Sequence, residues 1–318
     1  MAVDVFIVSG FLGAGKTTFI QKLIREVFCD ARVAVVENDF GEESIDAALL
    51  GSSGVMVTEI NSGCICCSLS GDFVKAFGDM LERFKPSHVI IEPSGVAKLS
   101  DVVLACEDPR IAQIAEVRGK ITVVDADNCR KYADNFGEFF VDQIQHADAI
   151  LLSRADRSPV RAEESARIIR ELNGSARIFS EPWSSIDSAE VLYPRTSEPS
   201  LDGCGDSHDP HHDHDHDHDH DHDHDHSAEE VFDEITLRPG RSFSSEDLRT
   251  RMSDIERMSS GTVLRAKGIV RGEDGYLNVQ YVPGDLKVEG TSVEGDIVCF
   301  IGRGLNRLEL AGLLLEAR

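Results

Sequence analysis

The sequence has no apolar run long enough to cross a bilayer, and no basic stretch that offsets its formal charge of −25. The first absence disfavours a membrane-spanning protein. The second disfavours nucleic acid as a partner, because nucleic-acid binding depends on clustered lysine and arginine. Residues 206–226 contribute nine aspartates and no lysine or arginine, so the rest of the chain still carries −16. The acidity is therefore general.

We expect no leader segment, because residues 3–8 already make an apolar, strand-like run. We therefore expect a cytoplasmic protein. In a reducing compartment, eight cysteines favour metal binding, catalysis or simple burial over disulfides. The length of 318 residues predicts two domains, and 41% hydrophobic with 28% charged residues is typical of a globular protein.

Residues 10–18, GFLGAGKTT, match the phosphate-binding pattern G-x-x-x-x-G-K-[ST]. The strand-like run Val3–Val8 precedes them, and a segment with apolar residues at helical spacing follows. The glycines let backbone amides surround a polyphosphate, Lys16 reaches the β- and γ-phosphates, and the Thr17 hydroxyl binds Mg²⁺. A chance glycine-rich turn would lack this flanking strand and helix. The sequence therefore predicts a nucleoside-triphosphate site.

Strand-like runs and helical segments alternate through the first half of the chain. This alternation predicts an α/β fold, a doubly wound and mostly parallel sheet that binds nucleotide at the carboxyl ends of its strands. Further strands are expected at Arg32–Val36, Val55–Ile60, Val89–Glu92, Lys120–Ala126, Ala149–Ser153 and Ala176–Ser180, and helices at Gly137–His146 and from Ser158-Pro159 to Asn173-Gly174.

Carboxylates follow two of the predicted strands. The acidic stretch Glu37–Asp46 lies where P-loop GTPases keep a switch that faces the metal and the γ-phosphate, although a solvated acidic loop is the alternative. Glu37 and Asp39 are candidate metal ligands in it. Glu92 ends its strand as in a Walker B element, and Gly95 lets the backbone approach the γ-phosphate. The Mg²⁺ candidates are Thr17, Asp39 and Glu92, and the catalytic candidates are Lys16 and Glu92.

Three of the eight cysteines, Cys64, Cys66 and Cys67, lie within four residues. Thiolates select Zn²⁺, Cu⁺ and other thiophilic ions. Neighbouring cysteines usually point apart, so a shared site needs an unusual turn, for which Gly63 supplies the freedom, or an outside ligand. Glu37 or a water could fill the fourth position. Incidental cysteines are the alternative, and their clustering in a polar loop disfavours it.

The strand Ala149–Ser153 leads into SRAD, residues 153–156. A carboxylate there accepts hydrogen bonds from N1–H and the 2-amino group of guanine, whereas adenine offers an unprotonated N1. A site built around this donor pair rejects the wrong base, so Asp156 predicts guanine and disfavours an ATP-dependent kinase. The expected nucleotide-binding residues are Gly10, Gly13, Ala14, Gly15, Lys16, Thr17, Thr18, Gly95, Arg154 and Asp156.

Ten of the twelve histidines lie in an alternating His/Asp tract between His208 and His226. Imidazoles bind Zn²⁺, Ni²⁺, Co²⁺ and Cu²⁺, so we expect a disordered metal-buffering linker with exchangeable sites. A linker that serves solubility alone would explain the aspartates but not the histidines. The buffer candidates are His208, His211, His212, His214, His216, His218, His220, His222, His224 and His226.

From Val231 onward the pattern is globular again. It predicts a strand, a helix opened by Ser244, three further strands and a last helix with a capping box at Asn306–Glu309. These elements make a smaller α+β domain without obvious chemistry, which we interpret as a lid or client-docking module. The expected domains are residues 1–184 for nucleotide binding, 185–230 for the linker and 231–318 for the α+β domain.

Four segments, SGFLGAGKTT, ENDFGEESID, GCICCS and IEPSGVA, follow one another in an order and spacing that resemble the CobW family of P-loop GTPases. VLRAKGIV, with its R-x-K-G, is similar to the second domain of that family. The resemblance covers nearly all of the chain except about residues 185–230. It implies a GTP-hydrolysing, Mg²⁺-dependent metallochaperone that carries zinc or cobalt on Cys64, Cys66, Cys67 and Glu37 and hands it to a client metalloprotein.

The sequence departs from the family pattern at the residues that are expected to bind the base. The family usually shows N-K-x-D where this chain has SRAD, so Asp156 is kept and Ser153 lacks a supporting amide. Arg154 can lay its flat guanidinium on a base, and a weaker preference for guanine is expected. No arginine can be identified as a finger for the γ-phosphate, so hydrolysis is expected to be slow without metal or client.

Two functions remain open. One is a GTPase whose hydrolysis gates metal transfer, and the other is a storage protein whose nucleotide site only regulates metal retention. They differ in whether the nucleotide state changes the metal affinity of the thiolates. The native metal, the client and the oligomeric state stay open, and a homo-oligomer is compatible with the sequence.

Overall fold

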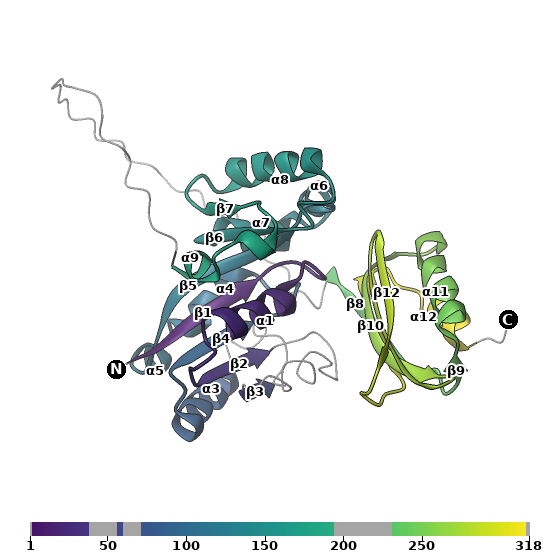
Figure 1. Ribbon diagram of the computed structural model, residues 1–318, viewed down its shortest axis with the longest axis horizontal. Helices are drawn as coiled ribbons and strands as arrows, with labels where there is room; N and C mark the ends of the chain where they lie inside the picture. The colour runs from purple at the N-terminus through teal and green to yellow at the C-terminus, as the bar shows by residue number, and fades with distance from the viewer. Residues whose placement is uncertain (1, 38–55, 60–70, 194–230, 316–318) are drawn as a thin grey trace.

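The computed structural model describes residues 2–37, 56–59, 71–193 and 231–315, and two sheets organise them (Figure 1). The first sheet has seven strands in the order β3-β2-β4-β1-β5-β6-β7, and every neighbouring pair is parallel. The strands are β1 (Val3–Ser9), β2 (Val33–Glu37), β3 (Met56–Glu59), β4 (His88–Glu92), β5 (Ala115–Asp125), β6 (Ala149–Ser153) and β7 (Arg177–Phe179).

Helices cover both faces of this sheet because alternate residues of each strand are apolar on opposite sides. In β1, Phe6 and Val8 pack with α1 and α9, whereas Val5 and Ile7 belong to the core formed with the other helices. The helices are α1 (Lys16–Glu26), α3 (Gly71–Phe84), α4 (Leu99–Cys106), α5 (Pro109–Ala112), α6 (Cys129–Asn135), α7 (Gly137–Gln145), α8 (Pro159–Leu172) and α9 (Ser188–Leu192). The predicted doubly wound fold is confirmed.

The second sheet is antiparallel along β12-β11-β10-β13-β8, and β9 adds a short parallel pairing to β10. Helices α11 and α12 cover its outer face, where Leu248 and Leu310 are buried in a separate core (Figure 1). The elements are β8 (Asp233–Leu237), β9 (Ser242–Phe243), α11 (Ser245–Ser253), a 3₁₀ turn (Asp254–Arg257), β10 (Thr262–Gly272), β11 (Gly275–Val282), β12 (Asp285–Thr291), β13 (Ile297–Arg303) and α12 (Arg307–Leu315).

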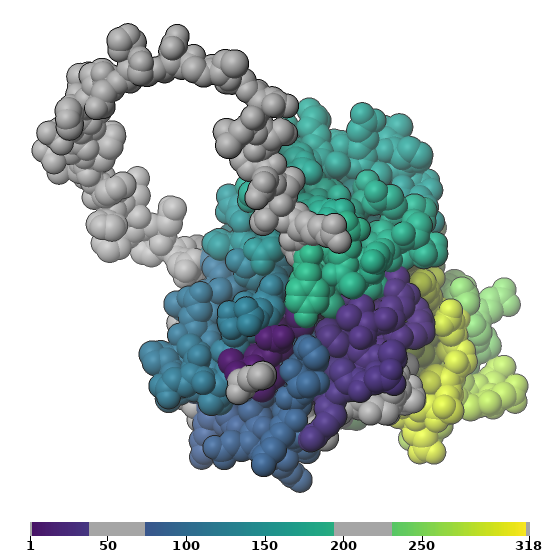
Figure 2. Space-filling view, turned by 60° about the vertical axis from the view of Figure 1, so that its left-hand side comes forward, coloured from purple at the N-terminus to yellow at the C-terminus, as the bar shows by residue number. Residues whose placement is uncertain are grey.

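The inner face of the second sheet packs against the first domain. Leu264 of β10 and Ile301 of β13 are buried in the same cluster as the first-domain core. Figure 2 shows the yellow and green surface of the second domain directly beside the purple N-terminal segment. The contact brings the second domain onto the nucleotide edge of the first.

One boundary differs from the expected ones. Helix α9 (Ser188–Leu192) falls in the range assigned to the linker, yet Val191 and Leu192 are fully buried against the first sheet, so the first domain extends at least to Leu192. At the other end, Phe232 precedes β8 and packs on Phe11 and Phe136 of the first domain. Apolar burial at both ends therefore places the linker between these positions. No helix in the described part of the chain combines the length and apolarity that a membrane crossing needs.

Candidate functional site

The phosphate-binding loop joins β1 to α1 as the sequence predicts. Gly10, Gly13 and Gly15 have positive φ angles of 143°, 68° and 111°, which residues with a side chain rarely adopt. A Cβ at Gly10 would lie 2.3 Å from the Val123 carbonyl oxygen. The loop therefore depends on glycine for both its shape and its closeness to the sheet.

Lys16 begins α1 and is 5% exposed. Its ammonium group donates a hydrogen bond of 2.9 Å to the Gly10 carbonyl, across the mouth of the loop. The amides at the start of a helix and an ammonium group are both of the kind that bind phosphate oxygens.

Thr17 and Glu92 meet beside the loop. The Thr17 hydroxyl lies 3.0 and 3.1 Å from the two carboxylate oxygens of Glu92, which ends the neighbouring strand β4. A hydroxyl and a carboxylate are oxygen ligands of the kind that Mg²⁺ prefers. Just beyond, a Cβ at Gly95 would lie 2.8 Å from the Leu12 amide nitrogen, so this backbone lies close against the phosphate loop. The donor set therefore fits a magnesium nucleotide.

Glu37 ends β2 in register with Glu92 of β4 and is 3% exposed. The other predicted ligands, Asp39, Cys64, Cys66 and Cys67, lie outside the described residues, as does the histidine tract. Within the described ranges no cluster of three or more metal-binding side chains occurs. The structure thus brings Glu37 to the edge of the sheet that holds Thr17 and Glu92.

Two other cysteines are poor metal ligands. Burial raises the pKa of the Cys106 thiol to about 12 and that of Cys129 to about 11. Metal binding uses the thiolate, so neither side chain supplies a ligand readily near neutral pH. Cys29 is exposed and Cys299 is half-buried. Within the described residues, these four cysteines form no second metal-binding cluster that could compete with Cys64, Cys66 and Cys67 for an ion.

A cavity of about 400 Å³ lies beside the phosphate loop at the end of β6. Ala14, Gly15 and Thr18 line one part of it, and Asp156 lines another. Trp183, which the sequence analysis missed, also lines this cavity and donates a hydrogen bond of 2.8 Å from its indole N–H to the Leu152 carbonyl. It lies in no motif, and the signal available in the sequence was that it is the sole tryptophan.

Arg154 lies between the phosphate loop and the carboxyl end of β5. Its guanidinium lies 2.8 Å from the carboxylate of Asp125, which is 2% exposed, and donates to the Gly13 carbonyl at 3.3 Å. A buried carboxylate holds a cation strongly because little water competes for it. Arg154 therefore braces the phosphate loop in this structure, and it also lines the cavity that Asp156 and Trp183 line.

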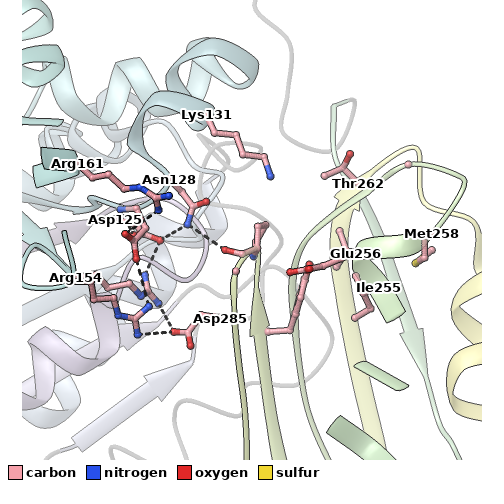
Figure 3. A pocket seen from close by; sticks show the side chains of 17 residues that line it. Asp125, Asn128, Lys131, Arg154, Arg161, Ile255, Glu256, Met258, Thr262 and Asp285 are labelled. Atoms are coloured by element: carbon pink, nitrogen blue, oxygen red, sulfur yellow. Dashed lines mark hydrogen bonds and ion pairs between the residues drawn. The ribbon is translucent and has the colours of Figure 1, made fainter. Parts of the chain in front are cut away.

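The hairpin β11–β12 of the second domain docks on the same loop (Figure 3). Its Asp285 pairs with Arg154 at 3.4 Å and with Arg157 at 3.3 Å. A Cβ at Gly13 would lie 2.0 Å from the Val282 side chain, so the hairpin touches the loop itself. The second domain thus contacts both the phosphate loop and the segment that carries Asp156.

A further cavity of about 380 Å³ lies between the two domains. Lys16, Thr17 and Glu92 line it from the first domain. The second domain contributes polar and charged side chains of β10, β11 and β12, which are Arg265, Lys267, Asn278, Gln280, Lys287 and Glu289. The sequence analysis assigned no chemistry to these residues.

Comparisons with known proteins agree with these features. The family model described as CobW/HypB/UreG, nucleotide-binding domain, matches residues 4–180, and the cobalamin synthesis protein cobW C-terminal domain matches residues 232–318. The zinc chaperone CobW of Sinorhizobium sp. is 33% identical over 199 residues, covering 52% of this chain and 56% of the relative. The zinc chaperone YeiR of Escherichia coli (strain K12) is 30% identical over 171 residues, covering 54% and 52%.

Among solved structures, the Zn(II)-bound YjiA GTPase from E. coli is 20% identical, with a TM-score of 0.48, and the match covers 99% of this chain and 100% of that one. The chain spans about half the length of the two curated relatives it matches above.

Proposed function

This chain belongs to the CobW family, and we propose on that premise that it is a GTP-hydrolysing metallochaperone. It would bind zinc, or cobalt, at Cys64, Cys66 and Cys67 and transfer the ion to a client protein according to its nucleotide state. The observation that carries the proposal is the pairing of Thr17 with Glu92 beside a glycine loop, on the edge of the sheet where Glu37 ends β2. This arrangement supports a nucleotide site next to the strand that precedes the acidic stretch.

The nucleotide part of the proposal assigns each group a task. Lys16 and the amides at the start of α1 bind the β- and γ-phosphates. Thr17 and Glu92 hold Mg²⁺, directly or through water, and Asp39 is the further candidate. When bound, Mg²⁺ neutralises charge on the phosphate oxygens. Gln143 donates to the carbonyls of Gly95 and Ala97, which steadies the backbone beside the γ-phosphate position.

Guanine recognition rests on Asp156, which lines the base cavity. Asp156→Ala is expected to weaken GTP binding by about 10–150-fold and leave ATP binding nearly unchanged, because hydrogen bonds to a charged acceptor contribute about 1.5–3 kcal/mol. Binding of both nucleotides is measured by titration calorimetry. Asp134→Ala removes an exposed aspartate on α6 and serves as the control. Equal turnover of GTP and ATP by the unaltered protein would contradict the guanine assignment.

Trp183 gives a direct readout of the base cavity. Because it is the sole tryptophan and lines this cavity with Asp156, we expect its fluorescence to change when GTP binds. The signal should saturate with the same affinity as calorimetric binding. Trp183→Phe keeps an aromatic wall and removes the signal. An emission spectrum that stays constant while calorimetry reports GTP binding would place the base elsewhere.

The metal part of the proposal rests on the chemistry of three thiols, with Glu37 as the fourth candidate ligand. Thiolates favour zinc over the hard ions, and two curated relatives are named zinc chaperones, so zinc is the first metal to test. The ten histidines between His208 and His226 are proposed to collect metal separately from hydrolysis. Their capacity is expected to fall below about pH 6.5, since imidazole binds metal only when neutral.

A storage protein is the second candidate, favoured by the histidine tract. The two functions separate on one measurement, the zinc affinity of the cysteine site with a GTP analogue, with GDP and without nucleotide. A chaperone gated by hydrolysis requires that the zinc affinity differ between the nucleotide states, because a nucleotide can change metal release only through that difference in affinity.

A further inference from the structure

We propose that the C-terminal domain completes the nucleotide site, with Arg265 and Lys267 of β10 binding the terminal phosphate of GTP and stabilising its charge during hydrolysis. The inference deepens the proposed function and rests on its assignment of GTP to the phosphate loop. In this proposal the C-terminal domain, which showed no evident chemistry in the sequence, contributes residues to the reaction site.

The register of β10 directs these two cations toward the loop. Arg265 and Lys267 are two residues apart, so they share one face of the strand. Ala266 and Val270 occupy the other face and are buried in the core under α11 and α12. Gly268 has a different task, since a Cβ there would lie 2.3 Å from the Ile297 carbonyl oxygen of β13. The R-x-K pair therefore faces the first domain, while the glycine allows close strand pairing.

The charge of the cavity between the domains suits a polyphosphate. Among the described residues that line it, five are cations and three are carboxylates, in a chain whose formal charge is −25. Lys267 is only 6% exposed. A surplus of positive charge at this one place therefore points to an anionic ligand.

The position of Arg265 and Lys267 in the cavity indicates that they bind the phosphate end of the nucleotide. Arg265 and Lys267 line the same cavity as Lys16, Thr17 and Glu92, which mark the γ-phosphate and its metal. Neither cation lines the cavity of Asp156 and Trp183, where the base is proposed to bind. The pair thus approaches the terminal phosphate from the side opposite the phosphate loop.

The docked hairpin β11–β12 holds Arg265 and Lys267 in position beside the phosphate loop. Asp285 holds Arg154 and Arg157 of the first domain, and Val282 lies against Gly13 of the phosphate loop. Asn128 also donates to the Pro283 carbonyl at 3.4 Å. These contacts lie at the tip of the hairpin whose first strand, β11, pairs with β10, so the loop and the two cations are positioned together.

The chemistry needs no other reactant than water. Its oxygen forms a bond to the γ-phosphorus while the bond to the β–γ bridging oxygen breaks, and GDP leaves with that electron pair. The proton of the attacking water passes to the released phosphate or to solvent. Negative charge shifts among the phosphate oxygens in the transition state, where an arginine fork and an ammonium group stabilise it.

The test compares full-length Arg265→Gln and Lys267→Met with the unaltered protein. For each variant we expect kcat for GTP to fall by about 10²–10³, the scale for losing one preorganised donor. The preference for a non-hydrolysable GTP analogue over GDP should fall as well, whereas GDP affinity should stay. Arg265→Lys keeps the charge without the fork and should recover part of kcat.

The matched control is Arg271→Gln, which removes an exposed arginine of the same strand outside the cavity. Thermal unfolding of every variant separates loss of the fold from loss of the contact, and Arg265→Lys repeats the test with less perturbation. Unchanged kcat and analogue preference in both folded variants would overturn the inference. Absence of GTP binding by the unaltered protein would instead overturn the proposed function.

Discussion

Lys16→Ala is expected to abolish GTP turnover, with a fall in kcat of at least about 10³-fold, the scale reported for a cation acting on a transferring phosphoryl group. The ammonium group is buried at the start of α1 and spans the loop to the Gly10 carbonyl. This is the position at which we propose that the β- and γ-phosphates bind. Phosphate release at saturating Mg²⁺ and GTP measures the effect.

The control for this variant lies on the same helix. Arg25→Ala removes a side chain that is 73% exposed and lies at the other end of α1. It should hydrolyse GTP like the unaltered protein. If Lys16→Ala kept a comparable rate while remaining folded, the phosphate loop would not be the site of hydrolysis, and the remaining assignments around Thr17 and Glu92 would lose their basis.

The first domain could be predicted because its signals are local. The phosphate loop is set by three closely spaced glycines, and α8 begins after Ser158, whose side chain accepts from the Arg161 amide as a cap. Buried parallel strands are recognised by short apolar runs, and β6 was predicted at its observed bounds, Ala149–Ser153. Such features require no knowledge of distant residues.

The features that were missed depend on distant contacts. Arg265 reaches the nucleotide site only through the docking of a separate domain, which no local spacing reports. The ion pair of Arg154 with the buried Asp125 joins two segments that are distant in the sequence, and local spacing does not report it. Strand β12, DLKVEGT, lies at the edge of its sheet and is rich in charge, so it lacks the apolar run on which the prediction relied.

The start of the last helix, α12, also shows that a prediction from local sequence can fail because of distant contacts. Asn306 accepts hydrogen bonds from the amides of Leu308 and Glu309, as a capping residue does. The Glu309 carboxylate instead binds Ser259 and Ser260 across the domain, so the predicted capping box is only half formed. Leu308, in the first turn of this helix, is 83% exposed. Tertiary partners outcompeted the local pairing.

Nucleotide state is expected to change the metal affinity of the cysteine site. Glu37 and Glu92 end adjacent strands in register, and β3 pairs with β2 so that Glu59 is level with Glu37. The acidic stretch and the cysteine motif therefore follow strands that end at the edge where Thr17 meets Glu92. Binding of Mg²⁺ and GTP at that edge is expected to draw the three thiols and Glu37 into one geometry, and hydrolysis to release them.

The size of this effect follows from linkage. Couplings between two sites are typically about 1–3 kcal/mol, or about 5–150-fold in affinity. Zinc must then strengthen the binding of a GTP analogue by the same factor as the analogue strengthens the binding of zinc. We expect the order analogue, then GDP or no nucleotide, from tighter to weaker zinc binding. Competition with a chromophoric chelator measures each affinity, on protein that lacks His208–His226 so that the tract does not mask the site.

Two variants make this experiment decisive. Cys66→Ala combined with Cys67→Ala should erase the difference between nucleotide states and leave metal-free GTP binding intact. Cys29→Ala removes an exposed cysteine elsewhere and should preserve the difference. Equal zinc affinity in all three nucleotide states would leave storage as the function, because GTP hydrolysis could then not change how tightly the zinc is bound. A difference that disappears only with the paired cysteines would tie hydrolysis to metal release through the thiols themselves.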